Sequence, residues 1–555
     1  MLRQFQVERA CEPCAPHFRK RSHGFRRLCA SASLVLGLLP ALRAASPVII
    51  QIKSQPAATF AAGFSGFNTA QPRDGVEYYD PNFIDAALPL KGGLLRYPGG
   101  TVSLDFDWNP LDTPWGGHTN VNWMNSLLDG SPPLVGGEAA GILPIAQQLT
   151  QAKGGANFSD YAAFANTLKA NTILCFNSYT DHNSGSATQM VLAAQNYGLN
   201  VVEWELGNEA YLYPAMYPTA SSYAAASNSY YNDIVFAAPT ATVGLFAGGW
   251  YPGTQGCGAK AALPQACFPT WDQGLSSTPQ YWNAISDHIY PIVGAATAKY
   301  TMSVLSGVLA HGSSDYVNSY LVPLAAPGTP IFITEFNCCT TPTNPFLSYL
   351  YNGIFLAEYI ARLSAVPNVK GVAINSLYTD NSGDPTTDYH GIIQSVNDFE
   401  SYLLNDVYPS STNTANNPNT KYVFYMSAPG LAMEVANEAI NSGTRMWPTT
   451  VSGGPTVNIT GFDGNPVPAI YAQMYLGSDG KHYLLVTNKS AQSELVTVEL
   501  NGVPVTGPFT LTYVANSSPT AANTAQDQLN VQIQHRTTPS NPMQLAGYSV
   551  TTVMW

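Results

Sequence analysis

Apolar runs of five to nine residues recur between residues 60 and 376, most of them separated by enough chain for a helix or a long loop. Parallel strands covered on both faces read as such continuous apolar runs, because neither face meets water. The chain contains eight: Phe60–Asn68, Leu94–Pro98, Thr172–Asn177, Val201–Leu206, Val243–Ala247, Ile285–Tyr290, Ile331–Phe336 and Val372–Ser376. Eight is the number of strands that closes a (β/α)₈ TIM barrel.

Helical stripes lie between several of these runs. Apolar residues spaced three and four apart predict helices over Phe83–Leu90, Tyr161–Lys169, Ala187–Tyr197 and Leu347–Leu363. We interpret these stripes as faces that pack on the barrel, without a cofactor role. The expected fold class is therefore α/β.

The pattern changes after about residue 420 to alternating apolar and polar positions, which Gly, Pro and Asn turns interrupt. The alternating segments are Ala469–Leu476, His482–Thr487, Leu495–Leu500, Phe509–Val514 and Tyr548–Met554. Such alternation is typical of strands with one buried face, and it predicts a C-terminal antiparallel β-sandwich.

Five segments, the linker included, follow from these patterns. Residues 1–45 combine a basic start, the apolar stretch Leu28–Leu42 and small residues, which are the three regions of a secretory signal peptide. We therefore expect a secreted or periplasmic protein; an uncleaved signal anchor is the alternative. Residues 46–58 are expected to hold an N-terminal strand that joins the β-sandwich, residues 59–405 the barrel, residues 410–419 a linker and residues 420–555 the sandwich.

Composition narrows the function classes. The chain is 45% hydrophobic and only 10% charged, which favours a well-buried globular protein over a disordered one. Its net charge of −12 and the lack of a basic patch argue against a nucleic-acid partner. We expect no membrane span in the mature chain, and the sequence does not indicate an oligomeric state.

Five cysteines follow the leader: Cys175, Cys257, Cys267, Cys338 and Cys339. Cys257 and Cys267 flank a Gly/Ala/Pro loop and are the best pair for a local disulfide. Cys338 and Cys339 are interpreted as buried packing or as a vicinal bridge. No Cys-x-x-Cys pair or His cluster at ligand spacing lies beyond the leader, so neither a metal nor a cofactor is expected.

Two glutamates mark the ends of two predicted strands. Glu209 closes the segment WELGNEA, and Glu335 lies in IFITEFN. Side chains at the carboxyl ends of barrel strands meet at one mouth. Cleavage of a glycosidic bond needs one carboxylic acid to protonate the leaving oxygen and a second carboxylate to attack the anomeric carbon or activate water. The pair therefore predicts glycoside hydrolysis.

One such glutamate alone would more often be a structural ion-pair partner. Glu203 and Glu205, on the same strand as WELGNEA, are interpreted in that way, or as residues at the base of the site. Arg96 is open to two interpretations, since it can pair with a framework acid such as Glu205 or support a catalytic carboxylate.

In order and spacing, these motifs resemble the retaining glycoside hydrolases of clan A. The resemblance implies that Glu209 is the acid/base, Glu335 the nucleophile and Asn208 a contact to the sugar 2-hydroxyl. Within the clan, LLRYPGGT (94–101) is similar to a segment of the family 51 α-L-arabinofuranosidases, and less closely to the family 79 β-glucuronidases and heparanases. Arg96 would then support the nucleophile.

The resemblance adds three further residues at the mouth. SDHIYP is similar to the His-x-Tyr element of the sixth barrel strand, which places His288 and Tyr290 there. Asn177 matches an asparagine at the end of the third strand. With Arg96 and Asn208, these residues are expected to bind the substrate.

We therefore expect a secreted retaining glycosidase that acts without a cofactor on plant or microbial polysaccharides, oligosaccharides or glycoconjugates. The chain after LRYPGG departs from family 51, which leaves the sugar open between an arabinofuranoside and a glucuronide. One rival is an endo-acting clan A glycanase with sugar-stacking tryptophans, for which the candidates are Trp108, Trp115, Trp123 and Trp250. The other is a non-catalytic carbohydrate-binding barrel protein.

Overall fold

The computed structural model describes the chain between residues 47 and 555, with gaps. Outside the description lie residues 1–46, 56–58, 60, 70–77, 101–102, 104–105, 108–117, 120–157, 179–180, 182–184, 214–215, 250–267, 292–300, 340–343, 380–389, 396–423, 460–463 and 525–526. The expected leader, the four candidate tryptophans, the Cys257–Cys267 pair and the expected linker therefore fall outside the described residues.

Eight parallel strands close into a barrel, which confirms the predicted fold class. They follow one another around the barrel in sequence order, and the last pairs with the first. The strands are β2 (Ser65–Asn68), β3 (Leu94–Tyr97), β6 (Asn171–Phe176), β7 (Val201–Leu206), β8 (Val243–Phe246), β9 (Ala284–Ile289), β10 (Ile331–Phe336) and β11 (Val369–Ile374). Strands β7 and β10 begin and end at the predicted residues, because asparagine, glycine or proline bounds each buried run.

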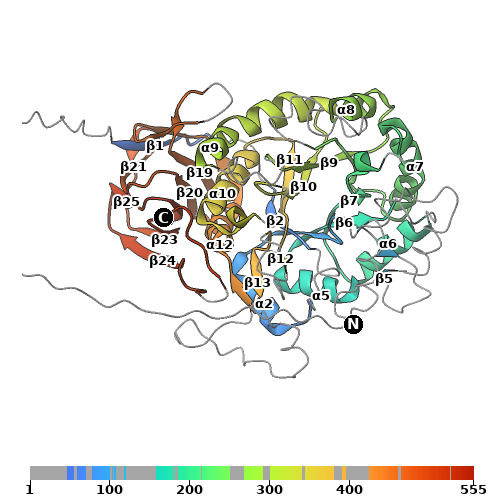
Figure 1. Ribbon diagram of the computed structural model, residues 1–555, viewed down its shortest axis with the longest axis horizontal. Helices are drawn as coiled ribbons and strands as arrows, with labels where there is room; N and C mark the ends of the chain where they lie inside the picture. Colours follow the sequence, from blue (N-terminus) through green and yellow to red (C-terminus); the bar gives the residue numbers. More distant parts are fainter. Residues whose placement is uncertain are drawn as a thin grey trace, which may run out of the picture. The chain divides into compact units, whose positions relative to one another are not determined.

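Helices surround the barrel strands (Figure 1). They are α2 (Pro81–Ala87), η1 (Leu88–Leu90), α5 (Phe158–Leu168), α6 (Gly185–Asn196), η3 (Ala210–Leu212), α7 (Ala220–Ala237), α8 (Phe268–Ser277), α9 (Met302–His311), the π-helical η6 (Gly312–Leu321), η7 (Val322–Leu324), η8 (Pro345–Ser348) and α10 (Leu350–Ser364). The four predicted helices correspond to α2 with η1, α5, α6 and α10. Helix α7 was not predicted because its Ala, Ser and Tyr residues give a weak stripe; its start is set by a capping box between Thr219 and Ser222.

Short strand pairs lie outside the barrel sheet. Strand β4 (Phe106–Asp107) pairs with β5 (His118–Thr119), and β13 (Ile393–Ser395) lies between β12 (Tyr378–Thr379) and β14 (Phe424–Met426). Helix α12 (Ala428–Ile440) follows, in a segment where the sequence predicted strands. It packs against α10 on one side and against strands of the C-terminal sheets on the other. The amide of Asn437 donates to the carbonyl of Leu90, which ties α12 to the barrel layer.

The C-terminal strands form two main sheets around their own apolar core, as predicted; all their strand pairs are antiparallel except that of β1 (Val48–Ile52) with β21 (Glu494–Leu500). One sheet contains β15 (Gly443–Trp447), β19 (Ile470–Gly477), β20 (His482–Asn488), β26 (Ser549–Met554), β23 (Phe509–Ala515) and β24 (Ile533–Thr538). The other contains β16 (Thr449–Ser452), β1 (Val48–Ile52), β21 (Glu494–Leu500), β22 (Val503–Pro504) and β25 (Met543–Leu545). A separate pair is formed by β17 (Thr456–Val457) and β18 (Val467–Pro468).

Strand β1 lies inside the second sheet, although it comes before the whole barrel in sequence. It pairs antiparallel with β16 and parallel with β21. Val48, Ile50 and Ile52 alternate into the sandwich core.

A buried ionic cluster joins α10 of the barrel layer to β20 of the sandwich. The carboxylate of Glu358 accepts hydrogen bonds from Lys489 Nζ at 2.5 Å, Arg362 Nη2 at 2.8 Å and Thr487 Oγ1 at 2.7 Å. Glu358 and Lys489 are almost completely buried. Although burial raises the pKa of Glu358, Lys489 and Arg362 lower it more, so its net pKa lies below the ordinary value. We call these four residues the Glu358 cluster.

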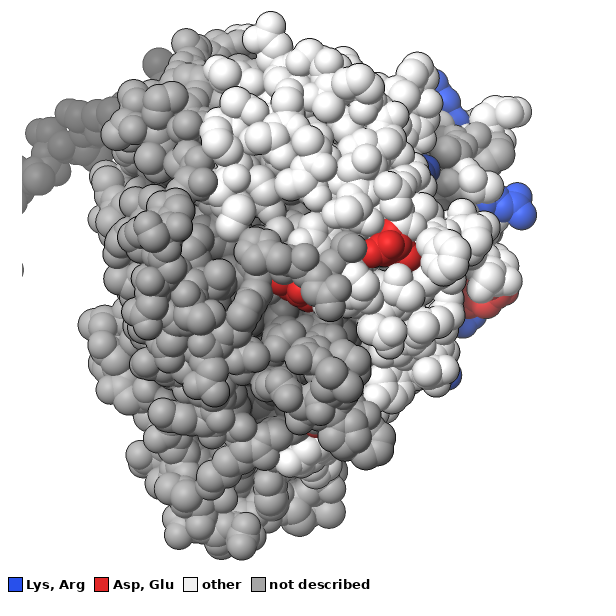
Figure 2. Space-filling model, turned by 90° about the vertical axis from the view of Figure 1, so that its right-hand side faces the viewer, with Lys and Arg blue, Asp and Glu red and all other residues white. Residues whose placement is uncertain are grey.

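Charged side chains are sparse on the face drawn in Figure 2, where most described atoms belong to uncharged residues. No described helix is long and apolar enough to cross a bilayer.

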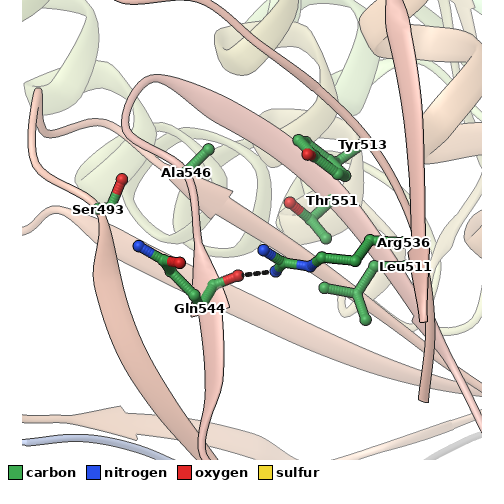
Figure 3. A pocket seen from close by; sticks show the side chains of 7 residues that line it. All are labelled: Ser493, Leu511, Tyr513, Arg536, Gln544, Ala546 and Thr551. Carbon is green, nitrogen blue, oxygen red and sulfur yellow. Dashed lines mark hydrogen bonds between the residues drawn. The ribbon is translucent and has the colours of Figure 1, made fainter. Parts of the chain in front are cut away.

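A pocket opens in the C-terminal sheets between β23, β24 and β25 (Figure 3). Its charged side chain, Arg536, donates to the carbonyl oxygen of Gln544 across the pocket.

Candidate active site

Glu209 lies just beyond the carboxyl end of β7. Gly207, at φ +85°, turns the chain there, and its N–H donates to the carbonyl of Phe176 at the end of β6. Glu209 itself has φ 44° and ψ 46°, the left-handed region that side chains other than glycine's adopt at a cost of about 1 kcal/mol. Such backbone strain is often found at functional sites.

Glu335 lies on β10, with its side chain 8% exposed. Its Oε1 accepts from Arg96 Nη1 at 2.8 Å and from Asn68 Nδ2 at 3.5 Å, and its Oε2 accepts from the hydroxyl of Tyr290 at 2.6 Å. Burial and the charge of Glu335 raise the pKa of Tyr290 well above the ordinary value, so the phenol keeps its proton and donates. Each oxygen of this carboxylate is therefore held by a separate strong donor.

His288 connects the two glutamates. Its Nδ1 lies 3.1 Å from Glu209 Oε1 and 3.7 Å from Glu335 Oε2. These two carboxylate oxygens are consequently no further apart than the sum of those distances. Burial lowers the pKa of His288, but the carboxylates of Glu335 and Glu209 outweigh it and raise the net pKa. The carboxyl ends of β7 and β10 thus bring both carboxyl groups to one mouth.

Arg96 is the central cation of the mouth and is completely buried. Its Nε donates to Glu205 at 2.9 Å, its Nη2 donates to Asn208 Oδ1 at 2.9 Å and also contacts Glu205, and its Nη1 reaches Glu335. Arg96 thus bonds both the framework acid Glu205 and Glu335, because the planar guanidinium has donors in several directions. The guanidinium therefore links Glu205 to Glu335.

Glu203 and Glu205 form the base of the site inside the barrel. Glu205 also accepts from the thiol of Cys175 at 3.2 Å. Burial, and then the neighbouring Glu205, raises the pKa of Glu203 well above the ordinary value, and Ser286 donates to Glu203 at 2.8 Å. Burial thus favours the neutral form of Glu203, whereas Glu205 is hydrogen-bonded to Arg96.

The two predicted amides lie at neighbouring strand ends. Asn208 is 2% exposed, and because its Oδ1 accepts from Arg96, the amide nitrogen is turned away from the guanidinium. Asn177 follows β6 directly and is fully buried, next to the Gly207 turn. All seven predicted residues thus belong to the carboxyl ends of β3, β6, β7, β9 and β10.

Three further residues of this site were not predicted. Asn68, at the end of β2, donates to Asn375 Oδ1 at 3.1 Å, and Asn375 donates to Tyr290 at 2.8 Å. Tyr211 donates to Glu209 Oε1 at 2.8 Å. Asn68 and Asn375 each stand at or near the end of a predicted apolar run, and that position is the signal that would have identified them.

The described residues contain no group of three or more His, Cys, Asp or Glu side chains that would hold a metal. Cys338 and Cys339 are buried free thiols whose Sγ atoms lie 3.5 Å apart. The described part of the site is therefore built from carboxyl, amide, phenol, guanidinium and imidazole groups. Such a set can donate and accept protons and can supply a carboxylate nucleophile.

No family model matches the sequence, and no curated protein matches it. Solved structures do resemble the fold of this chain. An α-L-arabinofuranosidase from Thermotoga maritima, in complex with arabinose, has 16% identity over 92% of this chain and 99% of its own, with a TM-score of 0.58.

A family 51 α-L-arabinofuranosidase from Bifidobacterium longum has 14% identity over 92% and 99% of the two chains, with a TM-score of 0.60. A 4-O-α-L-rhamnosyl-β-D-glucuronidase from Fusarium oxysporum has 12% identity over 91% and 100%, with a TM-score of 0.52. This likeness shows a shared fold, a TIM barrel followed by antiparallel sheets, which is the architecture that the clan A resemblance implied.

Proposed function

We propose that this protein is a retaining glycoside hydrolase that works by double displacement. The observation that carries the proposal is the pair of carboxyl groups at the ends of β7 and β10, joined through His288. Retaining enzymes place their two carboxyl groups about 5–5.5 Å apart, and inverting enzymes about 6.5–9.5 Å apart. The two His288 distances allow the shorter of these separations, and we propose retention because the motifs resemble those of the retaining clan A enzymes.

In the first step, a carboxylate oxygen of Glu335 attacks the anomeric carbon and the glycosidic C–O bond breaks. Glu209 gives its proton to the departing oxygen. Arg96 and Tyr290 hold the two oxygens of Glu335 before the attack, so that little reorganisation is needed. In the second step, water attacks the glycosyl-enzyme, Glu209 takes its proton, and Glu335 is released as a carboxylate.

The substrate class that we propose first is the α-L-arabinofuranosides. Two of the similar structures described above are arabinofuranosidases. A uronate would need a cation for its carboxylate, and among the described residues at the barrel mouth the guanidinium of Arg96 is already taken by Glu205 and Glu335. A β-glucuronide is the second candidate, favoured by the likeness to the Fusarium oxysporum glucuronidase.

A panel of nitrophenyl glycosides that includes arabinofuranoside and glucuronide tests this proposal. We expect hydrolysis of one class, with NMR of the first-formed product showing the retained anomer. A matching 2-fluoro glycoside should leave a covalent adduct on the peptide that contains Glu335. An inverted product would contradict double displacement. Release of new reducing ends from a polysaccharide without aryl glycoside cleavage would support the endo-acting alternative, and binding without any hydrolysis the non-catalytic one.

We also propose that residues 1–45 direct export of the chain, on the strength of their basic, apolar and small-residue regions. Mass spectrometry of the N-terminus of protein recovered from culture medium or periplasm tests this. A protein that stays in the cytoplasm with residue 1 intact would contradict it.

A further inference from the structure

Tyr211 contacts the same carboxyl oxygen of Glu209 that His288 approaches. Its hydroxyl donates to Glu209 Oε1 at 2.8 Å, while His288 Nδ1 lies 3.1 Å from that atom. The contact is made by the turn η3, in which the N–H of Leu212 donates to the carbonyl of Glu209. The left-handed backbone of Glu209 and this turn together bring a side chain two residues later back onto the carboxyl group.

The position of the Tyr211 hydroxyl is itself fixed. The ring is 1% exposed and meets Trp271 of α8 edge to face at 6.2 Å. Gly249, at φ +67°, leaves room for the hydroxyl, since a Cβ at that position would lie 2.9 Å from it. The N–H of Gly249 donates in turn to Asp287 Oδ1 at 2.9 Å. The hydroxyl is therefore confined between the carboxyl group and the backbone after β8.

In a protonated carboxyl group the carbonyl oxygen is the stronger hydrogen-bond acceptor, so it is the oxygen that best accepts from a phenol. Tyr211 donates to Oε1 at 2.8 Å, and His288 Nδ1 lies 3.1 Å from the same atom, which assigns the transferable proton to Oε2. A general acid must present its proton in one fixed direction toward the leaving oxygen. The phenol therefore selects which oxygen of Glu209 performs the transfer.

We propose that Tyr211 is a positioning residue that orients the acid/base Glu209 and directs proton transfer through its Oε2. The inference rests on the proposed function and adds to it a residue that acts only through Glu209. The ionisable groups that face Glu209 are His288 and Tyr290 from β9, Glu335 from β10, and Tyr211 itself, with Arg96 of β3 bound to the adjacent Asn208.

The test is Tyr211→Phe, measured with two arabinofuranosides (or glucuronides, if those are the substrates) that differ in leaving group. An alkyl or sugar alcohol needs protonation as it departs, whereas a nitrophenolate does not. We expect kcat/KM to fall by about 10- to 100-fold on the poor leaving group and by less than about threefold on nitrophenolate, a fraction of what general acid catalysis supplies. The basic limb of the pH profile should move to higher pH, because a hydrogen bond that favours the carboxylate has been removed.

Tyr281→Phe is the matched control, since Tyr281 donates its hydroxyl to the carbonyl of Ala224 in the helix layer. It should change neither the leaving-group dependence nor the pH profile. An equal loss on both substrates with an unmoved basic limb would show that Tyr211 is merely structural and overturn the inference. Glu209→Gln separates this failure from a failure of the proposed function. If that variant retains full activity on the poor leaving group, both fall; if it loses activity there while Tyr211→Phe does not, only the role of Tyr211 falls.

Discussion

The barrel mouth and the Glu358 cluster are both buried ionic networks, but they differ in the ratio of cations to carboxyl groups. In the Glu358 cluster, two cations and a hydroxyl serve one carboxylate, and the pKa of that carboxylate lies below the ordinary value. At the mouth, Arg96 bonds Glu205 and Glu335, and His288 lies next to Glu209. Glu203 lies beneath them. An excess of cations keeps a carboxylate charged and inert, whereas an excess of carboxyl groups makes some of them hold protons. The first arrangement joins two layers, and the second can move a proton.

The largest expected effect is a loss of activity when a carboxylate of the barrel mouth is replaced. Glu335→Gln keeps the shape of the side chain and an oxygen for Arg96, but it removes the nucleophile. We expect kcat/KM to fall by more than about 1,000-fold. The free energy of unfolding should fall by less than the roughly 3–5 kcal/mol of a broken buried pair, because Arg96 keeps its hydrogen bond to Glu205. Steady-state kinetics and urea unfolding measure the two quantities. The control is Glu438→Gln, which loses only the partly exposed pair with Lys91 and should behave as the parent. Retained hydrolysis in Glu335→Gln would contradict the assignment of the nucleophile.

The converse substitution, Glu358→Gln, should act on stability alone. It leaves Lys489 buried with its partner charge removed, which costs about 3–5 kcal/mol in comparable buried pairs. Urea unfolding measures the loss, and kcat/KM per folded molecule should stay within about twofold of the parent. Adding Lys489→Met should restore much of the stability, because the unpaired charge is then gone. If the double variant were no more stable than Glu358→Gln alone, the unpaired charge of Lys489 would not be the cause of the loss.

Asp272 and Asp287 are buried acids with no lysine or arginine among their described hydrogen-bond partners. They extend the comparison to carboxyl groups whose pKa no such cation lowers. Asp272 accepts from Gly248 N–H and Tyr320, and Asp287 from Gly249 N–H and Tyr316. Burial raises the pKa of Asp272 to about 6, and burial together with Asp272 raises that of Asp287 to about 8. Both carboxyl groups therefore hold protons in the folded chain at pH values where they have lost them in the unfolded chain.

Unfolding then releases protons, so the free energy of unfolding should fall as pH rises from about 4 to about 8, by at most about 1.4 kcal/mol per pH unit for each group. Asp287→Asn cannot ionise, and we expect a smaller slope between pH 6 and 8. Urea unfolding at several pH values measures it, and Asp85→Asn on the exposed side of α2 serves as control. Identical slopes for the parent and Asp287→Asn would show that Asp287 is not the group that titrates.

Much of the fold followed from apolar runs, because a strand buried on both faces leaves a clear pattern and its carboxyl end is marked by polar residues. Glu209 and Glu335 were predicted in that way, whereas His288 and Tyr290 came from the resemblance to the clan A enzymes. The bonds from Asn68 to Asn375 and Glu335 were not, because they depend on how the first and last barrel strands close, and a linear pattern does not contain that register. Tyr211 was missed since its role comes from a left-handed turn at a glutamate. Helix α12 was missed because it lies between two layers and is buried nearly all round, which removes the stripe.

The place of β1 between β16 and β21 has a consequence for how the chain can be divided. The C-terminal sheets contain an interior strand, β1, that precedes the barrel in sequence. The second sheet can therefore form only after nearly the whole chain has been synthesised. A fragment that begins at β14 would carry two unpaired strand edges where β1 belongs, and such edges invite association with other chains. The sandwich is thus not a detachable module, and an engineer who wishes to move it must bring residues 47–55 along or fuse them to the new start.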